Sequence, residues 1–195
     1  MSILSELKTP VFQAEKLPPI NLKGYYLDIN GEIIEEKRFS LEDIKKMPSG
    51  IVNARLTSVS GWSVRVDWYG VKWADLMKFI HLRESASHVV FESIGGYTTC
   101  VSLVDLKNPR VLLAYQVGTA ELEEKYGGPL RMVIPNLWGY KSCKWLTKIR
   151  FTNKMEDGYW EKRGYSRDGR ILAGRTFDIN TKTHKQIKGG EVTEF

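Results

Sequence analysis

Residues that build covalent or metal-bound frameworks are scarce in this sequence. Its 195 residues include two cysteines, Cys100 and Cys143, and three histidines, His81, His88 and His184. Two distant thiols do not make the dense disulfide framework of a small secreted domain, and we expect each to pack as a free, small buried residue. The histidines are too isolated to predict a zinc site.

Long apolar runs and a secretory leader are also missing. No stretch of about 18 apolar residues occurs, so the sequence predicts no membrane-spanning helix. The opening MSILSELKTPVFQ lacks the basic and apolar regions of a signal peptide, and we therefore expect a cytoplasmic protein. The length suits one domain, and 42% hydrophobic with 27% charged residues is typical of a globular protein.

The formal net charge is +6, and positive residues concentrate in the C-terminal third of the chain. They are Lys141, Lys144, Lys148, Arg150, Lys154, Lys162, Arg163, Arg167, Arg170, Arg175, Lys182, Lys185 and Lys188. No helix-turn-helix, zinc-finger or RNA-recognition signature accompanies them, so we expect no nucleic-acid partner. A bound anion accounts for part of this charge, and a solvated face or an acidic redox partner accounts for the remainder.

The local patterns in the first part of the chain predict the beginning of one α+β unit. Residues 1–21 are punctuated by prolines, which indicates an arm laid over the domain. Alternating residues over 25–34 predict a strand pair that turns at Asn30-Gly31. Ser40 is a suitable N-cap for a short helix.

The remaining elements are expected to continue this α+β pattern. Strands are predicted at residues 64–68, 89–91 and 111–115. Apolar residues at helical spacing predict a helix within 71–80. A turn-rich link is expected over 103–109.

The most informative segment is LRMVIPNLWGYKSCKWLTKIRF, in which a polar cluster separates two strand-like runs. Arg131 offers a planar set of donors that suits phosphate, and Gly139 lets the backbone approach a ligand closely. Lys141 and Lys144 add charge, and Ser142 adds a hydroxyl. These residues favour an anion site. The alternative is a pair of strands whose polar residues face water.

Together with its neighbours, this segment resembles the molybdopterin-binding domain of the sulfite oxidase family, and in particular its small stand-alone members such as the catalytic subunit of bacterial methionine-sulfoxide reductase. The similar segments, in chain order, are GYYLDINGEI, FSLEDIKKMP, LTSVSGWSVRVDWYGVKWADLM, GGYTTCVSLVD, VLLAYQVGTAELEEKYGGPLRMVIP, GYKSCKWLTKIRF and GYWEKRGY. The resemblance implies an α+β fold of mixed, largely antiparallel β-sheets with short helices. It places this oxidoreductase domain at residues 22–170, after the arm 1–21 and before a basic C-terminal extension, 171–195.

The resemblance implies a molybdenum-molybdopterin cofactor. The implied cofactor-binding residues are Ser93, Tyr126, Arg131, Ser142, Cys143 and Lys144. Arg131 and Lys144 would neutralise the pterin phosphate, and the Ser142-Cys143 backbone would cradle it. Trp62 and Trp138 are expected beside the metal-binding turn and the pterin loop, although packing in the core is an equal alternative.

One position departs from the family pattern. The family has a metal-ligating cysteine at the start of the turn that reads Ser58-Val59-Ser60-Gly61-Trp62 here, so the implied catalytic and metal-binding residue is Ser58. A hard, high-valent metal ion can bind a deprotonated oxygen ligand. An engineered substitution, a loss of redox chemistry and a metal without a protein ligand are alternatives that the sequence leaves open.

Two functions follow from the resemblance. The first is oxygen-atom transfer to or from a small oxo compound such as sulfite or a sulfoxide, with an unidentified electron-transfer partner. The second is binding of molybdopterin without catalysis, by a homologue that has lost the metal-ligating cysteine.

Overall fold

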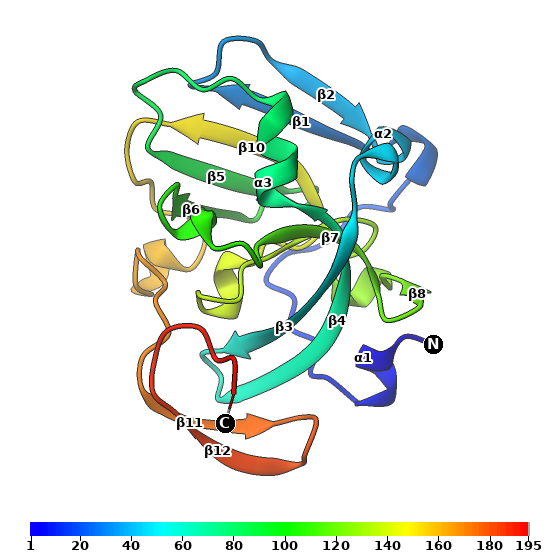
Figure 1. Ribbon diagram of the computed structural model, residues 1–195, viewed down its shortest axis with the longest axis vertical. Coiled ribbons are helices and arrows are strands. Elements are labelled where there is room, and N and C mark those ends of the chain that lie inside the picture. Colours follow the sequence, from blue (N-terminus) through cyan, green and yellow to red (C-terminus); the bar gives the residue numbers. More distant parts are fainter. Residues whose placement is uncertain (195) are drawn as a thin grey trace.

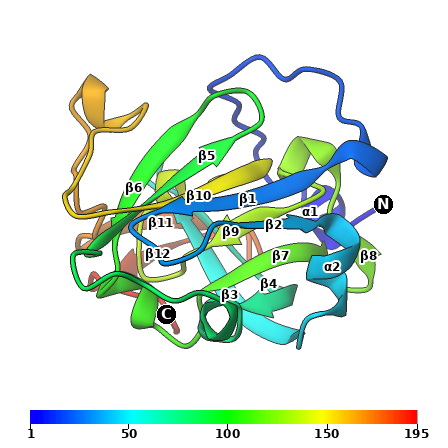
Figure 2. The same cartoon turned by 90° about the horizontal axis from the view of Figure 1, so that it is seen from above.

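The computed structural model describes residues 1–194 and contains two β-sheets joined by short helices and loops (Figure 1). The first sheet has the strand order β2-β1-β10-β5-β6. Its strands are β1 (Tyr26–Gly31), β2 (Lys37–Ser40), β5 (His88–Ser93), β6 (Thr98–Ser102) and β10 (Leu146–Thr152). Figure 2 shows β1 and β10 side by side in the middle of this sheet.

The second sheet is built around one long strand, β4, and has the order β12-β11-β4-β7-β8, with β3 paired to β4 and β9 paired to β7. Its strands are β3 (Gly50–Ser58), β4 (Trp62–Lys72), β7 (Leu112–Val117), β8 (Ala120–Glu121), β9 (Arg131–Val133), β11 (Gly174–Asp178) and β12 (Thr183–Ile187). Among the described strands, the pairs β1–β10 and β4–β11 are parallel and the other pairs are antiparallel. The expected mixed, largely antiparallel fold is therefore confirmed.

The helices are short. The α-helices are α1 (Ile3–Glu6), α2 (Leu41–Lys46) and α3 (Trp73–Leu76). The 3-10 helices are η1 (Leu22–Gly24), η2 (Met77–Phe79), η3 (Asp105–Lys107), η4 (Glu124–Tyr126), η5 (Gly139–Lys141) and η6 (Glu161–Arg163). No helix in the described part of the chain is long and apolar enough to cross a membrane.

Helix α2 begins where its sequence predicts. The Ser40 hydroxyl accepts a hydrogen bond from the Asp43 backbone N–H, and the Asp43 carboxylate accepts one from the Ser40 N–H. This reciprocal capping satisfies two donors that a helix start would otherwise leave unpaired. Helix α2 ends two residues before Pro48.

The predicted hairpin turn at Asn30-Gly31 is wrong. Gly31 is the last residue of β1 and pairs with Phe151 of β10, and the chain turns later, between β1 and β2. A Cβ at Gly31 would lie 2.1 Å from the Phe151 carbonyl oxygen, and the residue has a φ of +90°. Gly31 is therefore required for close approach of two strands and not for a two-residue turn.

Two main apolar clusters lie against the sheets. The first packs β1, β5 and β10 against α2 and α3 and includes Trp73, Phe91 and Phe151. The second lies on β3, β4 and β7 and includes Trp68 and, from the N-terminal segment, Leu4. The two clusters hold the sheets against different helices and loops. Loops that run between the sheets line a cavity.

The loop between β9 and β10 lines the cavity, because these two strands belong to different sheets. The two strand-like runs of the polar segment are both strands, but β9 pairs with β7 in one sheet and β10 pairs with β1 and β5 in the other. Two backbone hydrogen bonds, from Met132 N–H to the Cys143 carbonyl and from Leu146 N–H to the Leu130 carbonyl, still join the two runs. The alternative in which the polar residues face water is wrong for Arg131, Lys141 and Ser142, which are buried. Residues 134–145 cross from one sheet to the other, and this crossing carries η5 and the polar cluster.

Candidate cofactor site

One cavity gathers residues from segments that are far apart in the sequence. Its wall includes the arm residues 9–12, 14 and 15, the β3–β4 turn and η4. The crossing loop after β9 and the aromatic residues Trp160 and Tyr165 complete it. Of the residues implied by the family resemblance, Ser58, Tyr126, Arg131, Ser142 and Lys144 line it. The backbone therefore brings five of the seven implied residues to one place.

Arg131 is a buried cation that donates its hydrogen bonds to neutral carbonyl groups. Its side chain is in β9 and is 4% exposed, and it donates to the carbonyl oxygens of Tyr126 at 2.7 Å, Met132 at 3.2 Å and Ser142 at 3.3 Å. The guanidinium also lies 5.3 Å from the centre of the Trp68 ring. Burial lowers the pKa of Arg131 to about 10, so the group is still positively charged at neutral pH.

Lys144 adds a second cation beside Arg131. Burial, and next the positive charge of Arg131, lower the pKa of Lys144 to about 7. Its ammonium group lies 4.2 Å from the centre of the Trp145 ring and donates to the carbonyl oxygen of Phe12. Like charges at such a site oppose one another unless an anion compensates them.

Within residues 1–194, neither Arg131 nor Lys144 forms an ion pair with a carboxylate. The Glu15 carboxylate raises the pKa of Lys144, but burial and the charge of Arg131 lower it more strongly. Two neighbouring cations in a cavity, without a paired acid, make a site for an anionic ligand.

The crossing loop presents its backbone to the same site. The Ser142 hydroxyl accepts a hydrogen bond from the Ile134 N–H at 3.0 Å, which fixes the loop against the residues after β9. Cys143 is buried with its thiol on the Lys144 carbonyl, and burial raises the pKa of that thiol. A Cβ on Gly139 would lie 3.3 Å from the Thr57 carbonyl oxygen, so a glycine lets this loop approach the end of β3.

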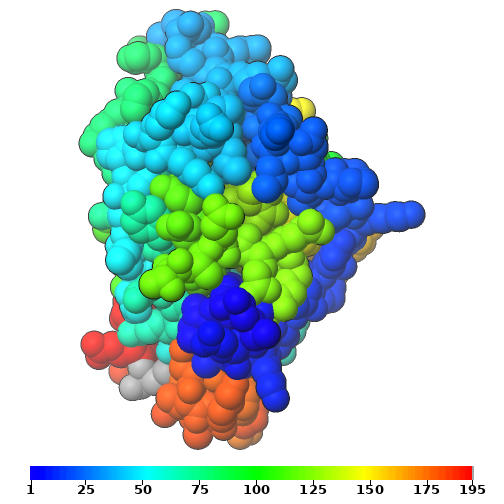
Figure 3. Space-filling model, turned by 90° about the vertical axis from the view of Figure 1, so that its right-hand side faces the viewer, coloured from blue at the N-terminus to red at the C-terminus, as the bar shows by residue number. Residues whose placement is uncertain are grey.

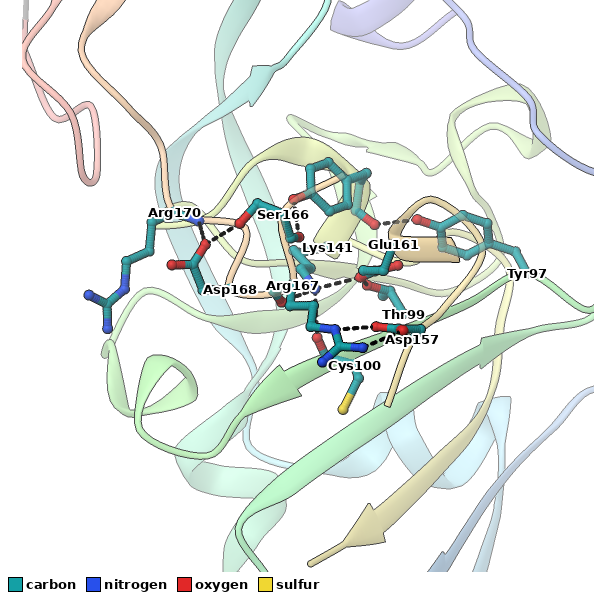
Figure 4. Close-up of polar contacts among 11 residues, drawn as sticks. Tyr97, Thr99, Cys100, Lys141, Asp157, Glu161, Ser166, Arg167, Asp168 and Arg170 are labelled. Atoms are coloured by element: carbon teal, nitrogen blue, oxygen red, sulfur yellow. Dashed lines mark hydrogen bonds and ion pairs between the residues drawn. The ribbon is translucent and has the colours of Figure 1, made fainter. Parts of the chain in front are cut away.

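Lys141 does not contribute charge to the cavity, contrary to the expectation from its sequence position. It is fully buried and forms an ion pair with Glu161 (Figure 4). Its ammonium group also donates to the carbonyl oxygens of Cys100 at 2.8 Å and Arg167 at 2.6 Å. Three acceptors saturate the ammonium group, so Lys141 ties the crossing loop to the segment that carries η6.

Ser58 lies at the end of β3 and lines the cavity. Its hydroxyl oxygen accepts a hydrogen bond from the Ser60 N–H at 3.1 Å. The hydroxyl therefore supports the β3–β4 turn and retains a proton that it can donate. Of the two tryptophans expected here, Trp62 lines the cavity, whereas Trp138 packs against a separate small apolar cluster.

Ser93 and Cys143 do not line the cavity wall. The Ser93 hydroxyl accepts from the backbone N–H groups of Gly95 at 3.2 Å and Tyr97 at 3.0 Å, and it donates to the Glu15 carboxylate. The Tyr126 hydroxyl lies 3.1 Å from each of two carbonyl oxygens in the N-terminal segment, and this buried group donates to them. Ser93 and Tyr126 are thus engaged by the first 15 residues, as Lys144 is through Phe12.

The sequence did not identify the arm as part of the cavity wall, nor Glu161 as the buried partner of Lys141. A carboxylate such as Glu161 becomes significant only when its buried partner is known, and the partner Lys141 is 20 residues away. In the sequence, only the resemblance of GYWEKRGY to the family pointed to the segment that contains Glu161. It did not predict the direction of the side chains. The prolines of the arm indicated that it is extended, but not where it lies.

Comparisons with known proteins identify the family. The sequence profile described as "oxidoreductase molybdopterin binding domain" matches residues 14–160. The uncharacterized oxidoreductase YuiH of Bacillus subtilis is 35% identical over 151 residues, which are 76% of this chain and 76% of YuiH. The residues that the profile matches include strands β1 to β10 and most of the residues that line the cavity.

More distant relatives carry functional names. The mitochondrial sulfite oxidase of Drosophila melanogaster is 27% identical over 76% of this chain and 31% of its own length. The protein-methionine-sulfoxide reductase catalytic subunit MsrP of Ralstonia nicotianae is 26% identical over 76% of this chain and 52% of its own length. This chain thus spans about half or less of these two named relatives.

A solved structure shares the fold. The crystal structure of the sulfane dehydrogenase SoxCD from Paracoccus pantotrophus aligns with a TM-score of 0.68 and 16% sequence identity, over 89% of this chain and 47% of that chain.

Proposed function

This chain belongs to the oxidoreductase molybdopterin binding domain family, and on that premise we propose that its cavity holds molybdopterin with molybdenum for oxygen-atom transfer to or from a small oxo compound such as sulfite or a sulfoxide. The observation that carries the proposal is the pair of cations, Arg131 and Lys144, which face the cavity without a paired carboxylate. A phosphate group supplies the negative charge that such a pair requires.

The residues present fit this cofactor. Arg131 and Lys144 would bind its phosphate, and the backbone at Ser142-Cys143 would lie along it. Ser58 would stand at the metal position, where its hydroxyl can hold or release a proton. When bound, the cofactor supplies two-electron redox chemistry at molybdenum, and the protein supplies orientation and exclusion of water.

The aromatic wall supports a small, partly apolar substrate. Trp62, Trp160 and Tyr165 line the cavity, and the Trp160 and Tyr165 rings lie 4.8 Å apart. Such a wall excludes water and packs against apolar substituents of a sulfoxide, while the site cations favour an anion such as sulfite. An electron-transfer partner completes either reaction, and the cytoplasmic location stays a prediction that the two free cysteines suit.

The test is analysis of protein purified from cells that make the cofactor and receive molybdate. We expect pterin and molybdenum in equal amounts, a metal that changes oxidation state in a redox titration, and turnover of sulfite with an artificial acceptor or of a sulfoxide with an artificial donor. Pterin with a metal that does not cycle would favour the non-catalytic binding protein. Absence of pterin would contradict the assignment of the cavity.

A further inference from the structure

The aromatic wall of the cavity belongs to one long loop. Residues 153–173 connect β10 to β11, and η6 is the helix within them. Two rings of this loop, Trp160 and Tyr165, line the cavity. In the described residues 159–170, no apolar side chain is fully buried, so packing alone does not fix these rings. Polar contacts are needed to hold the loop in one position.

The crossing loop supplies such contacts from its backbone and from a tyrosine. The Trp138 N–H donates to the Gly169 carbonyl oxygen at 2.7 Å, near the end of the long loop. The Tyr140 hydroxyl donates to the Ser166 carbonyl oxygen at 2.6 Å, directly after Tyr165. The backbone that carries the Tyr165 ring is therefore tied to the crossing loop.

Lys141 makes buried contacts with the same long loop (Figure 4). Its ammonium group pairs with the Glu161 carboxylate at 2.5 Å and donates to the Arg167 carbonyl oxygen at 2.6 Å. The Thr99 hydroxyl donates to the same carboxylate at 2.8 Å, so the pair also reaches β6. Glu161 directly follows Trp160 in the chain, so a fixed carboxylate also fixes the backbone that carries the indole ring.

The crossing loop also contributes to the cavity wall itself. The residues of this loop that line the cavity include Gly139, Tyr140, Ser142 and Lys144. Lys141 lies among them in sequence but does not line the cavity. One short segment thus carries the proposed phosphate-binding groups and holds the aromatic wall, and Lys141 acts on the wall rather than on a ligand.

The wall offers ring surface that the protein leaves partly uncovered. The ring centres of Trp160 and Tyr165 lie 4.8 Å apart, and those of Tyr140 and Tyr165 lie 5.3 Å apart with the rings nearly perpendicular. Tyr165 is 36% exposed, and Trp160 is half-buried. Val59, next to Ser58 in the chain, also lines the cavity. A flat apolar group fits such surroundings, because aromatic rings pack edge-to-face or offset-stacked with one another.

We propose that these rings form a subsite for an aryl substituent of the oxo substrate, and that Lys141 and Tyr140 are positioning residues that hold the subsite in place. The inference rests on the proposed function, because the substituent is attached to the atom whose oxygen is transferred. Sulfite carries no such group, so the subsite favours an aryl sulfoxide over sulfite and over small alkyl sulfoxides. Lys141 and Tyr140 affect this preference through the backbone that carries Trp160 and Tyr165.

The N-terminal side of the cavity is anchored independently of this network. The Ser2 N–H and the Ser5 hydroxyl donate to the Glu123 carboxylate, and Leu4 is buried in the second apolar cluster. Figure 3 shows the N-terminal segment, in dark blue, seated against the green part of the chain and the orange C-terminal hairpin. Changes at residues 140 and 141 therefore leave this side in place, and a changed affinity reports on the aromatic wall.

Unreactive analogues test the subsite without turnover. Methyl phenyl sulfone and dimethyl sulfone carry the same oxygen-bearing sulfur, and one methyl group of the second is a phenyl group in the first. Titration calorimetry of the purified full-length chain should show the phenyl compound binding about tenfold more tightly, which is the size of effect expected from one or two aromatic contacts.

Tyr140→Phe is the mildest test of positioning, because it keeps the ring in the wall and removes only the hydroxyl that donates to Ser166. We expect it to lower the preference for the phenyl compound severalfold. Tyr115→Phe is the matched control, since it removes a phenol hydroxyl that donates to the Ser49 hydroxyl at 3.0 Å, outside the cavity. The control should keep the wild-type preference.

A neutral double variant tests the buried ion pair. Lys141→Met combined with Glu161→Gln removes both charges, leaves no unpaired ion, and keeps an acceptor for the Thr99 hydroxyl. We expect the phenyl preference to disappear, since the contacts that hold the wall are lost. Arg38→Met combined with Asp28→Asn is the control, because it removes an exposed ion pair in the first sheet. This control should keep the preference.

Steady-state kinetics separates positioning from folding. With an artificial electron donor, the positioning variants should raise the KM for methyl phenyl sulfoxide severalfold, retain kcat, and leave kcat/KM for dimethyl sulfoxide near the value of the controls. Loss of pterin in these variants, or an equal loss of activity for both sulfoxides, would mean that the two residues only support the fold, and would overturn their positioning role.

The outcomes distinguish the subsite from the proposed function. If the wild type contains pterin and redox-active molybdenum but binds both sulfones equally, the subsite is overturned and the proposed function stands. If protein without pterin still prefers the phenyl compound, the subsite is supported and the proposed function fails. If Tyr140→Phe and the double variant both keep the wild-type preference, the positioning role is contradicted.

Discussion

At the scale of single residues, burial lowers the pKa of both cations of the site, but with different consequences for their charge at neutral pH. Arg131 stays charged, because even a pKa lowered to about 10 lies well above neutral pH. Lys144, with a pKa of about 7, is half neutral at that pH. Binding of an anion favours the charged form of Lys144, so binding takes up a proton and the pocket's affinity depends on pH.

We expect the affinity for molybdopterin phosphate or pyrophosphate to fall as pH rises through 7. The affinity falls because Lys144 is mostly neutral above its lowered pKa. The free protein must then bind a proton before Lys144 can hold the anion as a cation. Between pH 6 and 8 the wild type should lose about tenfold relative to Lys144→Arg, since arginine stays charged. Titration calorimetry at each pH gives the ratio of the two proteins' affinities. The ligand's own ionisation is the same for both proteins and cancels from this ratio. A ratio that stays constant with pH would contradict the role of Lys144.

Ser58 is the residue on which the proposed chemistry depends. If position 58 faces the metal, Ser58→Cys should raise metal retention and oxygen-atom-transfer activity, since thiolate is the stronger donor. X-ray absorption at the molybdenum edge should then show one additional sulfur ligand.

Ser60→Cys is the control for Ser58→Cys, because Ser60 lines the cavity two residues further on. It should leave the metal's ligand shell as it is in the wild type. If Ser58 only supports the turn through the Ser60 N–H, Ser58→Cys changes stability slightly and the ligand shell not at all.

Residue types were easier to predict than residue directions. The presence of Arg131 and Lys144 at one cavity could be predicted from a local segment and a family resemblance. The direction of Lys141 could not, since it depends on Glu161, Cys100 and a loop that the local sequence does not reveal. The contacts of Ser93 and Tyr126 with the arm were missed for the same reason.

At the scale of elements, local signals succeeded where the element is stabilised by its own residues. Helix α2 follows from the Ser40–Asp43 cap, and the predicted strand at 64–68 lies within β4. The helix expected within 71–80 is split into α3 and η2. The predicted Asn30-Gly31 turn is wrong because Gly31 pairs with Phe151, which is distant in sequence. The strands β9 and β10 were expected, but the sequence did not predict which sheet each of them joins. Pairing between distant strands carries no local signal.

The Lys141–Glu161 ion pair is the connection between elements that shapes the cavity. Glu161→Gln leaves the buried ammonium without its counter-charge, which should reduce the free energy of unfolding by about 3–5 kcal/mol. Asp157→Asn is the control, because its ion pair with Arg167 lies at the surface, where solvent screens the charges and such pairs contribute little to stability. Urea unfolding followed by tryptophan fluorescence measures both. Equal midpoint shifts for the two variants would contradict the structural importance of the buried pair.

At the scale of the whole molecule, the two sheets act as a frame for one cavity. The strand β4 joins the parts of the second sheet, and the crossing from β9 to β10 links that sheet to the first. Residues before 22 and after 170 are integrated in the structure: Leu4 joins the second cluster, and β11 pairs with β4 (Figure 1). The division into arm, domain and extension at residues 22 and 170 stays a prediction about folding units.

The central claim is that the cavity binds a molybdopterin phosphate through Arg131. The most direct measurement is the pterin fluorescence released by acid from wild type, Arg131→Ala and the exposed-site control Arg175→Ala, each produced under limiting cofactor supply. Loss of one charge-assisted contact, about 1.5–3 kcal/mol, should weaken cofactor binding roughly 10- to 150-fold and leave Arg131→Ala with little pterin. The control should match the wild type. Equal pterin content in wild type and folded Arg131→Ala would contradict the account.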